Sequence, residues 1–206
     1  MIRNRPVGHR LGRRYPAEVL TADELDALLA ACSPRSASGA RSRALIALLA
    51  RSGLRIGEAL ALRPSDIDLK RRTIRLRHTK SGHAQTRHYH PSADDALLRW
   101  IDVRRARGLN GAPLFCTLGG GPLAAESVRA TLRRLASRAG IAKAVRPHGL
   151  RHSFAVALEQ AGTPVTVISA LLGHSSVAVT SVYLKHLTNA EAGTALTAVE
   201  LPALSC

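Results

Sequence analysis

Apolar residues recur every three or four positions along most of the chain, and this pattern predicts a mainly helical protein. The first helix is expected to begin near Thr21, because this residue can cap it and Glu24 stands three positions later, as in a capping box. A second helix is expected from about Ala40 to a C-terminal glycine, Gly53. The positions expected to face inward in these two helices are Leu28, Leu29, Leu45, Ile46, Leu48 and Leu49.

Further helices are expected later in the chain, most of them ended by glycine or proline. Ser92 can cap a helix that runs to about Arg107 with Leu97, Leu98 and Ile101 facing inward. The others are expected around Val128 to Gly140 and at about 148–161, 164–172 and 177–187.

Residues 66–90 instead have the short runs that are typical of β-strands. The strand segments are expected at 66–68, 73–78 and 86–90. A turn at Ser81-Gly82 would place Lys80 at or near the tip of a basic hairpin. The sequence therefore predicts an α+β fold that is mainly α-helical, with a small antiparallel sheet.

The charge of the chain is strongly unbalanced. Among its 206 residues, 30 Lys and Arg face 14 Asp and Glu, which gives a formal charge of +16. No acid lies between Asp68 and Asp94 or between Glu126 and Glu159, although each stretch holds seven basic residues. This separation points to a basic face and favours a nucleic acid as the partner.

The cysteines and the apolar segments indicate the cellular compartment of the protein. Three cysteines, odd in number and widely spaced, predict a reduced, cytoplasmic protein without a disulfide framework. No apolar segment has the length of a membrane span, and the N-terminus has no signal-peptide pattern.

Residues 148–183 carry the side chains best suited to chemistry. His148 and Arg151 stand at the start of one predicted helix, His174 follows another, and Tyr183 lies nine positions later. A single carboxylate lies among them. This composition suits the binding and attack of a phosphodiester.

Five pieces of the sequence resemble the tyrosine recombinase (phage integrase) family in the family's order, over roughly residues 17–190. They are Gly53-Leu54-Arg55-Ile56-Gly57-Glu58-Ala59-Leu60, Thr79-Lys80-Ser81-Gly82, His148-Gly149-Leu150-Arg151-His152, Leu171-Leu172-Gly173-His174 and Tyr183. Each piece alone is weak, but together they are highly specific. The resemblance implies a site-specific DNA recombinase or integrase with the catalytic residues Arg55, Lys80, His148, Arg151, His174 and Tyr183.

By this resemblance, Tyr183 attacks a DNA phosphate and forms a 3′-phosphotyrosine, which a 5′-hydroxyl of a partner strand later attacks. Arg55 and Arg151 would hold the nonbridging oxygens through bidentate forks, which lysine cannot offer. His174 would complete this phosphate clamp. Glu58 would orient Arg55, although a buried structural ion pair between them is the alternative.

The resemblance also implies how protons move. Histidine titrates near neutrality, so His148 suits the acceptor role opposite the tyrosine, and Lys80 would protonate the leaving 5′ oxygen. No cofactor or metal is expected. The i, i+4 pair of His148 and His152 lacks a nearby carboxylate, and Arg151 between them would repel a cation. Four other histidines are expected on the hairpin surface facing DNA: His78, His83, His88 and His90.

Most members of the family have a further N-terminal helical domain. Here the first helix is expected near Thr21, and residues 1–16 predict a basic N-terminal arm or an ordinary disordered terminus. The chain is therefore either a compact single-domain recombinase or a fragment. Residues 17–190 would form the catalytic domain, acting on double-stranded DNA as a homotetramer, with accessory DNA-bending proteins as further partners.

Residues 191–206 carry an apolar stripe at roughly helical spacing, interrupted by Pro202. The resemblance implies that this segment docks on a neighbouring protomer, and the alternative is a terminal helix packed on its own domain.

Other classes of protein are alternatives to a recombinase. A type IB topoisomerase-like enzyme shares the chemistry, and a non-catalytic DNA-binding regulator would not need an intact Tyr183. A metal-dependent nuclease would rely on the carboxylate pairs Asp66/Asp68 and Asp94/Asp95, which lie near no candidate phosphate-binding histidine in the sequence.

Overall fold

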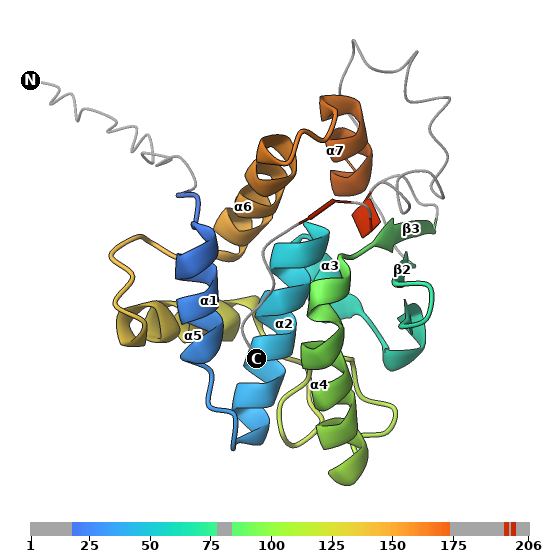
Figure 1. Ribbon diagram of the computed structural model, residues 1–206. Coiled ribbons are helices and arrows are strands. Elements are labelled where there is room, and N and C mark those ends of the chain that lie inside the picture. Colours follow the sequence, from blue (N-terminus) through green and yellow to red (C-terminus); the bar gives the residue numbers. More distant parts are fainter. Residues whose placement is uncertain (1–17, 78–83, 174–195, 198, 201–206) are drawn as a thin grey trace, which may run out of the picture.

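The computed structural model describes residues 18–77, 84–173, 196–197 and 199–200. Helices surround a central helix, with a three-stranded antiparallel sheet at one side (Figure 1). The helices are α1 (Ala22–Ala30), α2 (Ala37–Ser52), α3 (Ile56–Ala61), α4 (Asp94–Ala106), α5 (Ala125–Arg138), α6 (Pro147–Gln160) and α7 (Val165–Leu172). The strands are β1 (Ile67–Asp68), β2 (Thr73–Leu76) and β3 (Gln85–His88). This architecture confirms the predicted fold class.

Helix α2 is the centre of the core. All of its residues from Ala44 to Ser52 are buried, and it packs against α4 and α6. A helix covered on every side must be largely apolar around its whole circumference, as this one is. Ser36 caps it by accepting a hydrogen bond from the Gly39 amide, so the helix begins three residues earlier than predicted. Gly53 ends it with a φ of 62°, as the glycine signal predicted.

The predicted capping box of α1 is confirmed. The Glu24 amide donates to Thr21 Oγ1 at 3.2 Å, and the Thr21 amide donates to Glu24 Oε2 at 2.9 Å. Lys143 Nζ reaches the same carboxylate oxygen at 2.6 Å, and the Leu20 amide donates to Ser153 Oγ at 2.8 Å. These contacts fasten the start of α1 to the loop before α6 and to α6 itself.

The inward face of α4 differs from the prediction. Leu97 is fully buried, but Leu98 is 45% exposed, and Trp100 takes the inward position instead. Leu97, Trp100 and Arg104 are buried at i, i+3 and i+7 spacing, which is one helical face. Arg104 is inward because its guanidinium donates to backbone carbonyls of the following loop, including Leu109 O at 2.8 Å. The helix is preceded by a 3-10 turn, Pro91–Ala93, that His90 caps rather than Ser92.

The sheet confirms the predicted antiparallel strands. Ile67 pairs with Ile74, and Ile74 pairs with Arg87 in the next strand. Ile74 is fully buried and faces the core, while residues 78–83 of the segment between β2 and β3 lie outside the described residues. Strand β3 ends near α2, because the His90 amide donates to Arg51 O at 2.8 Å.

A second, smaller core joins α6, α7 and the C-terminal segment. Leu196 is fully buried among apolar side chains of α6 and α7, and Val199 packs against the same cluster. These two residues therefore contact their own chain, while 191–195 and 201–206 lie outside the described residues.

His90 is not on a DNA-facing surface as predicted. It is 8% exposed, and its Nε2 lies 3.0 Å from Val199 O. Because the Ser92 amide donates to His90 Nδ1, the proton of a neutral ring is on Nε2, which donates to Val199 O. His88 is half-buried, and His78 and His83 lie outside the described residues.

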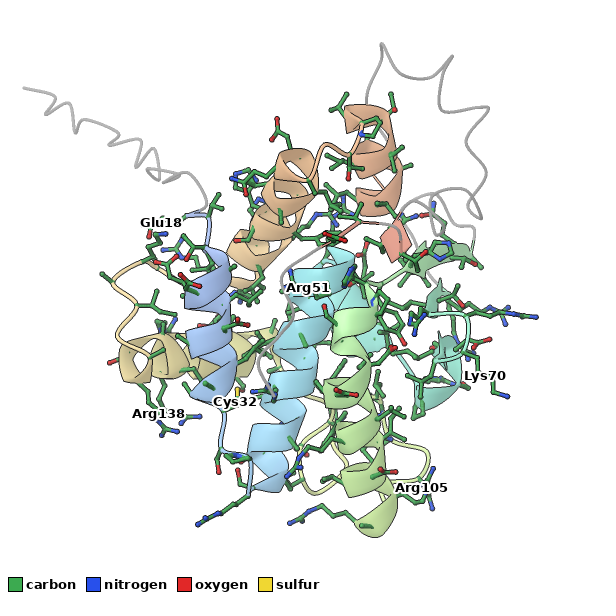
Figure 2. All side chains as sticks on the ribbon, in the orientation of Figure 1. Glu18, Cys32, Arg51, Lys70, Arg105 and Arg138 are labelled. Atoms are coloured by element: carbon green, nitrogen blue, oxygen red, sulfur yellow. The ribbon has the colours of Figure 1, made fainter. Side chains whose placement is uncertain are left out.

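The basic residues of the two acid-free stretches reach widely separated parts of the molecule. Figure 2 shows Lys70 and Arg138, one from each acid-free stretch, on opposite sides of the molecule, with Arg51 pointing inward between them. Within the described part of the chain, no helix combines the length and apolarity of a membrane span.

Candidate active site

A glycine turn between α2 and α3 positions the first candidate residue. The left-handed conformation of Gly53 reverses the chain direction, and buried Leu54 anchors it before Arg55 starts α3 as its N-cap. The helix therefore begins one residue after Arg55. A side chain at Gly53 would overlap Leu172 Cδ2 and lie 3.0 Å from Phe154 Cδ1. The turn thus needs glycine both for its φ and for close packing.

Arg55 is paired with Glu58 as expected, but the pair is not buried. The Arg55 amide donates to Glu58 Oε2 at 2.7 Å, and Arg55 Nη1 donates to Glu58 Oε1 at 3.0 Å. The Arg55 side chain is nevertheless 52% exposed. Glu58 therefore holds Arg55 at its backbone amide and at Nη1, while the rest of the guanidinium stays accessible to solvent and to a ligand.

Arg151 is the buried counterpart. It is 5% exposed on α6, and its guanidinium donates to Gly53 O and, at 2.8 Å, to Leu172 O. Arg151 thereby ties the end of α2 to the end of α7. Burial lowers the pKa of Arg151 to about 10, and the nearby Arg55 adds to this effect. An anion bound beside Arg151 would offset the unfavourable proximity of the positive charges of Arg151 and Arg55.

His148 lies one helical turn before Arg151 on α6. Both are on the first half of a helix that Pro147 starts, a favoured position for proline. His148 is exposed, so it is accessible to a ligand, and His152 is exposed as well.

A third arginine belongs to this cluster, and the sequence reasoning did not single it out. Arg87 of β3 is half-buried, and burial lowers its pKa, with Glu58 and Arg55 as the charged groups that act on it. Its only sequence signal was its place in the acid-free stretch of predicted strands. Arg55, Arg87 and Arg151 come from α3, β3 and α6, so only the tertiary structure brings them together.

Three of the six predicted catalytic residues lie outside the described part of the chain: Lys80, His174 and Tyr183. Residue 80 belongs to the connection between β2 and β3, and residue 174 directly follows Gly173, which ends α7 with a φ of 65°.

One carboxylate of each pair in the nuclease alternative forms an ion pair within the fold. Asp66 Oδ1 accepts from Arg77 Nε at 2.6 Å, and Asp94 Oδ2 accepts from Arg72 Nε at 2.8 Å. Asp66 has a side chain that is 1% exposed, so its role is to hold the start of the sheet.

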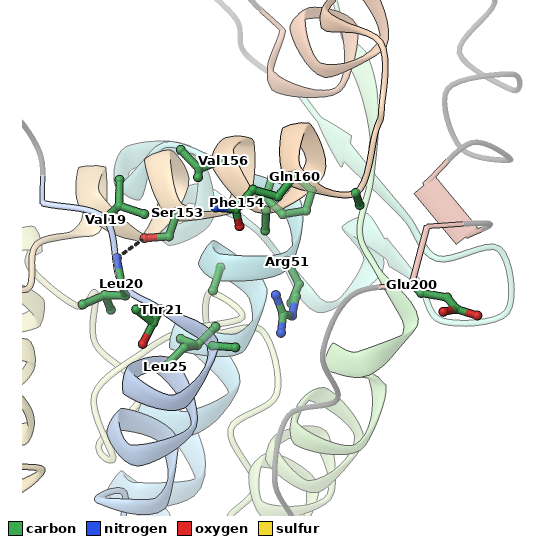
Figure 3. A pocket seen from close by; sticks show the side chains of 14 residues that line it. Val19, Leu20, Thr21, Leu25, Arg51, Ser153, Phe154, Val156, Gln160 and Glu200 are labelled. Carbon is green, nitrogen blue, oxygen red and sulfur yellow. Dashed lines mark hydrogen bonds between the residues drawn. The ribbon is translucent and has the colours of Figure 1, made fainter.

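A separate cavity of about 380 Å³ lies between α1, α2 and α6 (Figure 3). Arg51, Phe154 and Glu200 are among its lining residues, whereas Arg55, His148 and Arg151 are not. The cavity is therefore not the candidate active site.

Residues 18–190 match the phage integrase family, and the chain belongs to this family. The relatives it matches are named as tyrosine recombinases. Tyrosine recombinase XerD of Mycobacterium leprae (strain TN) is 37% identical over 183 residues, which cover 84% of this chain and 57% of that protein. The protein of the same name from Corynebacterium glutamicum is 37% identical and is covered to 59%. This chain therefore spans somewhat more than half the length of these relatives.

Solved structures agree with this assignment. XerA recombinase superposes with a TM-score of 0.71 at 32% identity, covering 84% of this chain and 62% of that one. XerH site-specific recombinase, solved bound to its difH substrate in a pre-cleavage complex, gives a TM-score of 0.67 at 26% identity, with 84% of this chain and 51% of that one covered.

Proposed function

We propose that this protein is a site-specific DNA recombinase that cleaves and rejoins strands through a 3′-phosphotyrosine intermediate. The observation that carries the proposal is the joint placement of Arg55 and Arg151 around the Gly53 turn in a chain of the phage integrase family. One arginine is exposed and the other buried, so a phosphate that reaches Arg55 from solvent can be held by both guanidinium forks.

The roles of the residues follow from the charge that develops in the reaction. Attack on a phosphodiester builds negative charge on the nonbridging oxygens, which Arg55 and Arg151 stabilise without moving far, because Glu58 and the carbonyls at positions 53 and 172 already hold them. His174 is proposed to donate a further hydrogen bond to the same oxygens.

The nucleophile needs help because a tyrosine hydroxyl has a pKa near 10, so only ~0.1% is ionised at neutral pH. We assign nucleophilic attack to Tyr183, proton acceptance to His148 and protonation of the leaving 5′ oxygen to Lys80. Atoms balance without water: the phosphorus–oxygen bond to the 5′ oxygen breaks as the bond to the tyrosine oxygen forms, and the bond energy is kept for rejoining.

Partners and compartment belong to the proposal as well. Double-stranded DNA fits the formal charge of +16, and strand exchange between two duplexes requires a homotetramer, with DNA-bending proteins as accessory factors. The buried free thiols of Cys32 and Cys116 fit a reducing cytoplasm.

The test is covalent capture. A nicked suicide duplex made from the DNA that flanks the gene traps the intermediate, because the short fragment beyond the cleavage point diffuses away and prevents rejoining. Wild type should give a protein–DNA adduct that survives denaturation. Tyr183→Phe should give none while its DNA affinity stays within a few-fold, because one hydroxyl adds little to a phosphate-dominated interface.

Two results would contradict this reading. Residual adduct with Tyr183→Phe would move the nucleophile to another residue. Relaxation of a supercoiled plasmid that carries no recombination site would instead indicate the topoisomerase-like activity.

A further inference from the structure

The guanidinium of Arg87 rests against the end of α7. A Cβ atom added at Gly173 would overlap this guanidinium, lying 2.9 Å from Arg87 Nε and still nearer to its outer atoms. Gly173 has a φ of 65° and caps α7, so the absence of a side chain there serves both the turn and the approach of Arg87. A tertiary contact therefore explains why glycine occupies position 173 in the Leu171-Leu172-Gly173-His174 piece.

Two arginines thus meet the same helix end. Arg151 donates to Leu172 O at 2.8 Å, and Arg87 lies against the next residue. The C-terminus of a helix carries partial negative charge and unpaired carbonyls, so cations there are favourable. Arg87 itself is held in place by Gln85, whose Oε1 accepts from Arg87 Nη2 at 2.6 Å.

The cluster holds more positive charge than its own acid can balance. Three guanidinium groups, Arg55, Arg87 and Arg151, act on one another, and Glu58 is the one carboxylate of the described residues that acts on both Arg87 and Arg151. A partly buried excess of positive charge is unfavourable without an anion, and it favours a bound phosphate.

We propose that Arg87 is a positioning residue of this site: it fixes the C-terminal end of α7, whose Leu172 carbonyl holds the guanidinium of Arg151, and thereby sets where Arg151 meets the scissile phosphate. The inference rests on the proposed function. Because Arg87 is half-buried against Gly173 and bonded to Gln85, it acts through the helix end rather than as a third fork on the phosphate.

The first test removes the contact from each side. Arg87→Gln should slow single-turnover cleavage of the nicked suicide duplex by roughly 10- to 100-fold, the usual effect of misplacing a reacting group slightly. Gly173→Ala should give a loss of similar size, because its Cβ would displace the guanidinium. Gly162→Ala is the matched control: Gly162 also follows a helix and has a φ of 78°, but an added Cβ would meet nothing within 4 Å. It should cleave within a few-fold of wild type.

The second test separates positioning from mere stability. If Arg87 works through Arg151, then Arg87→Gln should add little to the loss already caused by Arg151→Lys, since residues acting in series are not additive. Urea unfolding of each variant gives the folded fraction under assay conditions, and the cleavage loss should exceed what that fraction explains.

The outcomes are distinct. Wild-type protein that forms no adduct would overturn the proposed function itself. If wild type forms the adduct, three results would each overturn the role of Arg87 alone: unimpaired cleavage by Arg87→Gln, a defect that its unfolded fraction explains, or full additivity with Arg151→Lys.

Discussion

Replacing Gly53 by alanine probes the junction on which the candidate site is built. The φ of 62° places residue 53 in the left-handed region, where a side chain costs about 1 kcal/mol. The added Cβ would also overlap Leu172 Cδ2, and relieving such overpacking typically costs about 1–3 kcal/mol. Both costs arise from the same added Cβ atom, and together they should lower the free energy of unfolding of Gly53→Ala by about 2–4 kcal/mol.

The same motif supplies a matched control. Gly57 lies in α3, and a Cβ added there would meet nothing within 4 Å. Alanine is favoured over glycine inside a helix by about 0.5–1 kcal/mol, so Gly57→Ala should leave stability unchanged or raise it slightly. Urea titration followed by fluorescence measures both variants, because the single tryptophan, Trp100, is fully buried in the core.

The substitution should also reach the chemistry. Gly53 O accepts a hydrogen bond from Arg151, so a displaced turn moves the buried fork as well. In the absence of urea and at low temperature, adduct formation by Gly53→Ala should therefore fall by more than its fraction of unfolded protein explains. Equal urea midpoints for the two variants would refute the close packing of Gly53 against α6 and α7.

Four further outcomes are expected. Arg55→Lys and Arg151→Lys should each slow cleavage ~100-fold or more although the charge is kept, because the bidentate fork is lost; rates near wild type would mean that both residues have only a structural role. Lys80→Ala should be rescued by a substrate whose leaving 5′ oxygen is replaced by sulfur, which departs without protonation; an equally slow sulfur substrate would show that Lys80 is not the acid. Burial lowers the pKa of His90, so the unfolded chain binds the proton first as the pH falls. Stability should thus be full above about pH 6.5 and decline below it, as measured by urea midpoints, with a weaker decline in His90→Gln; an identical decline in both would contradict this. Leu196→Ala should lower the free energy of unfolding by about 2–5 kcal/mol, because Leu196 is fully buried against α6 and α7, and an unchanged midpoint would mean that this contact is not formed in solution.

Much of the fold could be predicted because its signals are local. The capping box of Thr21 and Glu24 involves residues three positions apart, and the glycine end of α2 depends on the φ of one residue. Helices and strands have periods that a short window reveals, so α2 and the sheet were predicted within a few residues. The inward face of α4 was harder to predict, because Leu98 and Trp100 are both hydrophobic. Only packing against the neighbouring helix decides which of the two is buried.

The sequence by itself determined the family and the chemical types at the site, since five ordered pieces and a basic, acid-poor composition do not depend on coordinates. Tertiary structure decided what each arginine does. It buried Arg151 between Gly53 and Leu172, left Arg55 half in solvent, and brought Arg87 against Gly173 from a strand 86 positions earlier in the chain. It also turned His90 inward onto Val199. The physical reason is common to all four side chains: their burial and their partners depend on groups that are distant in sequence, and the local hydrophobic periodicity carries no information about such groups.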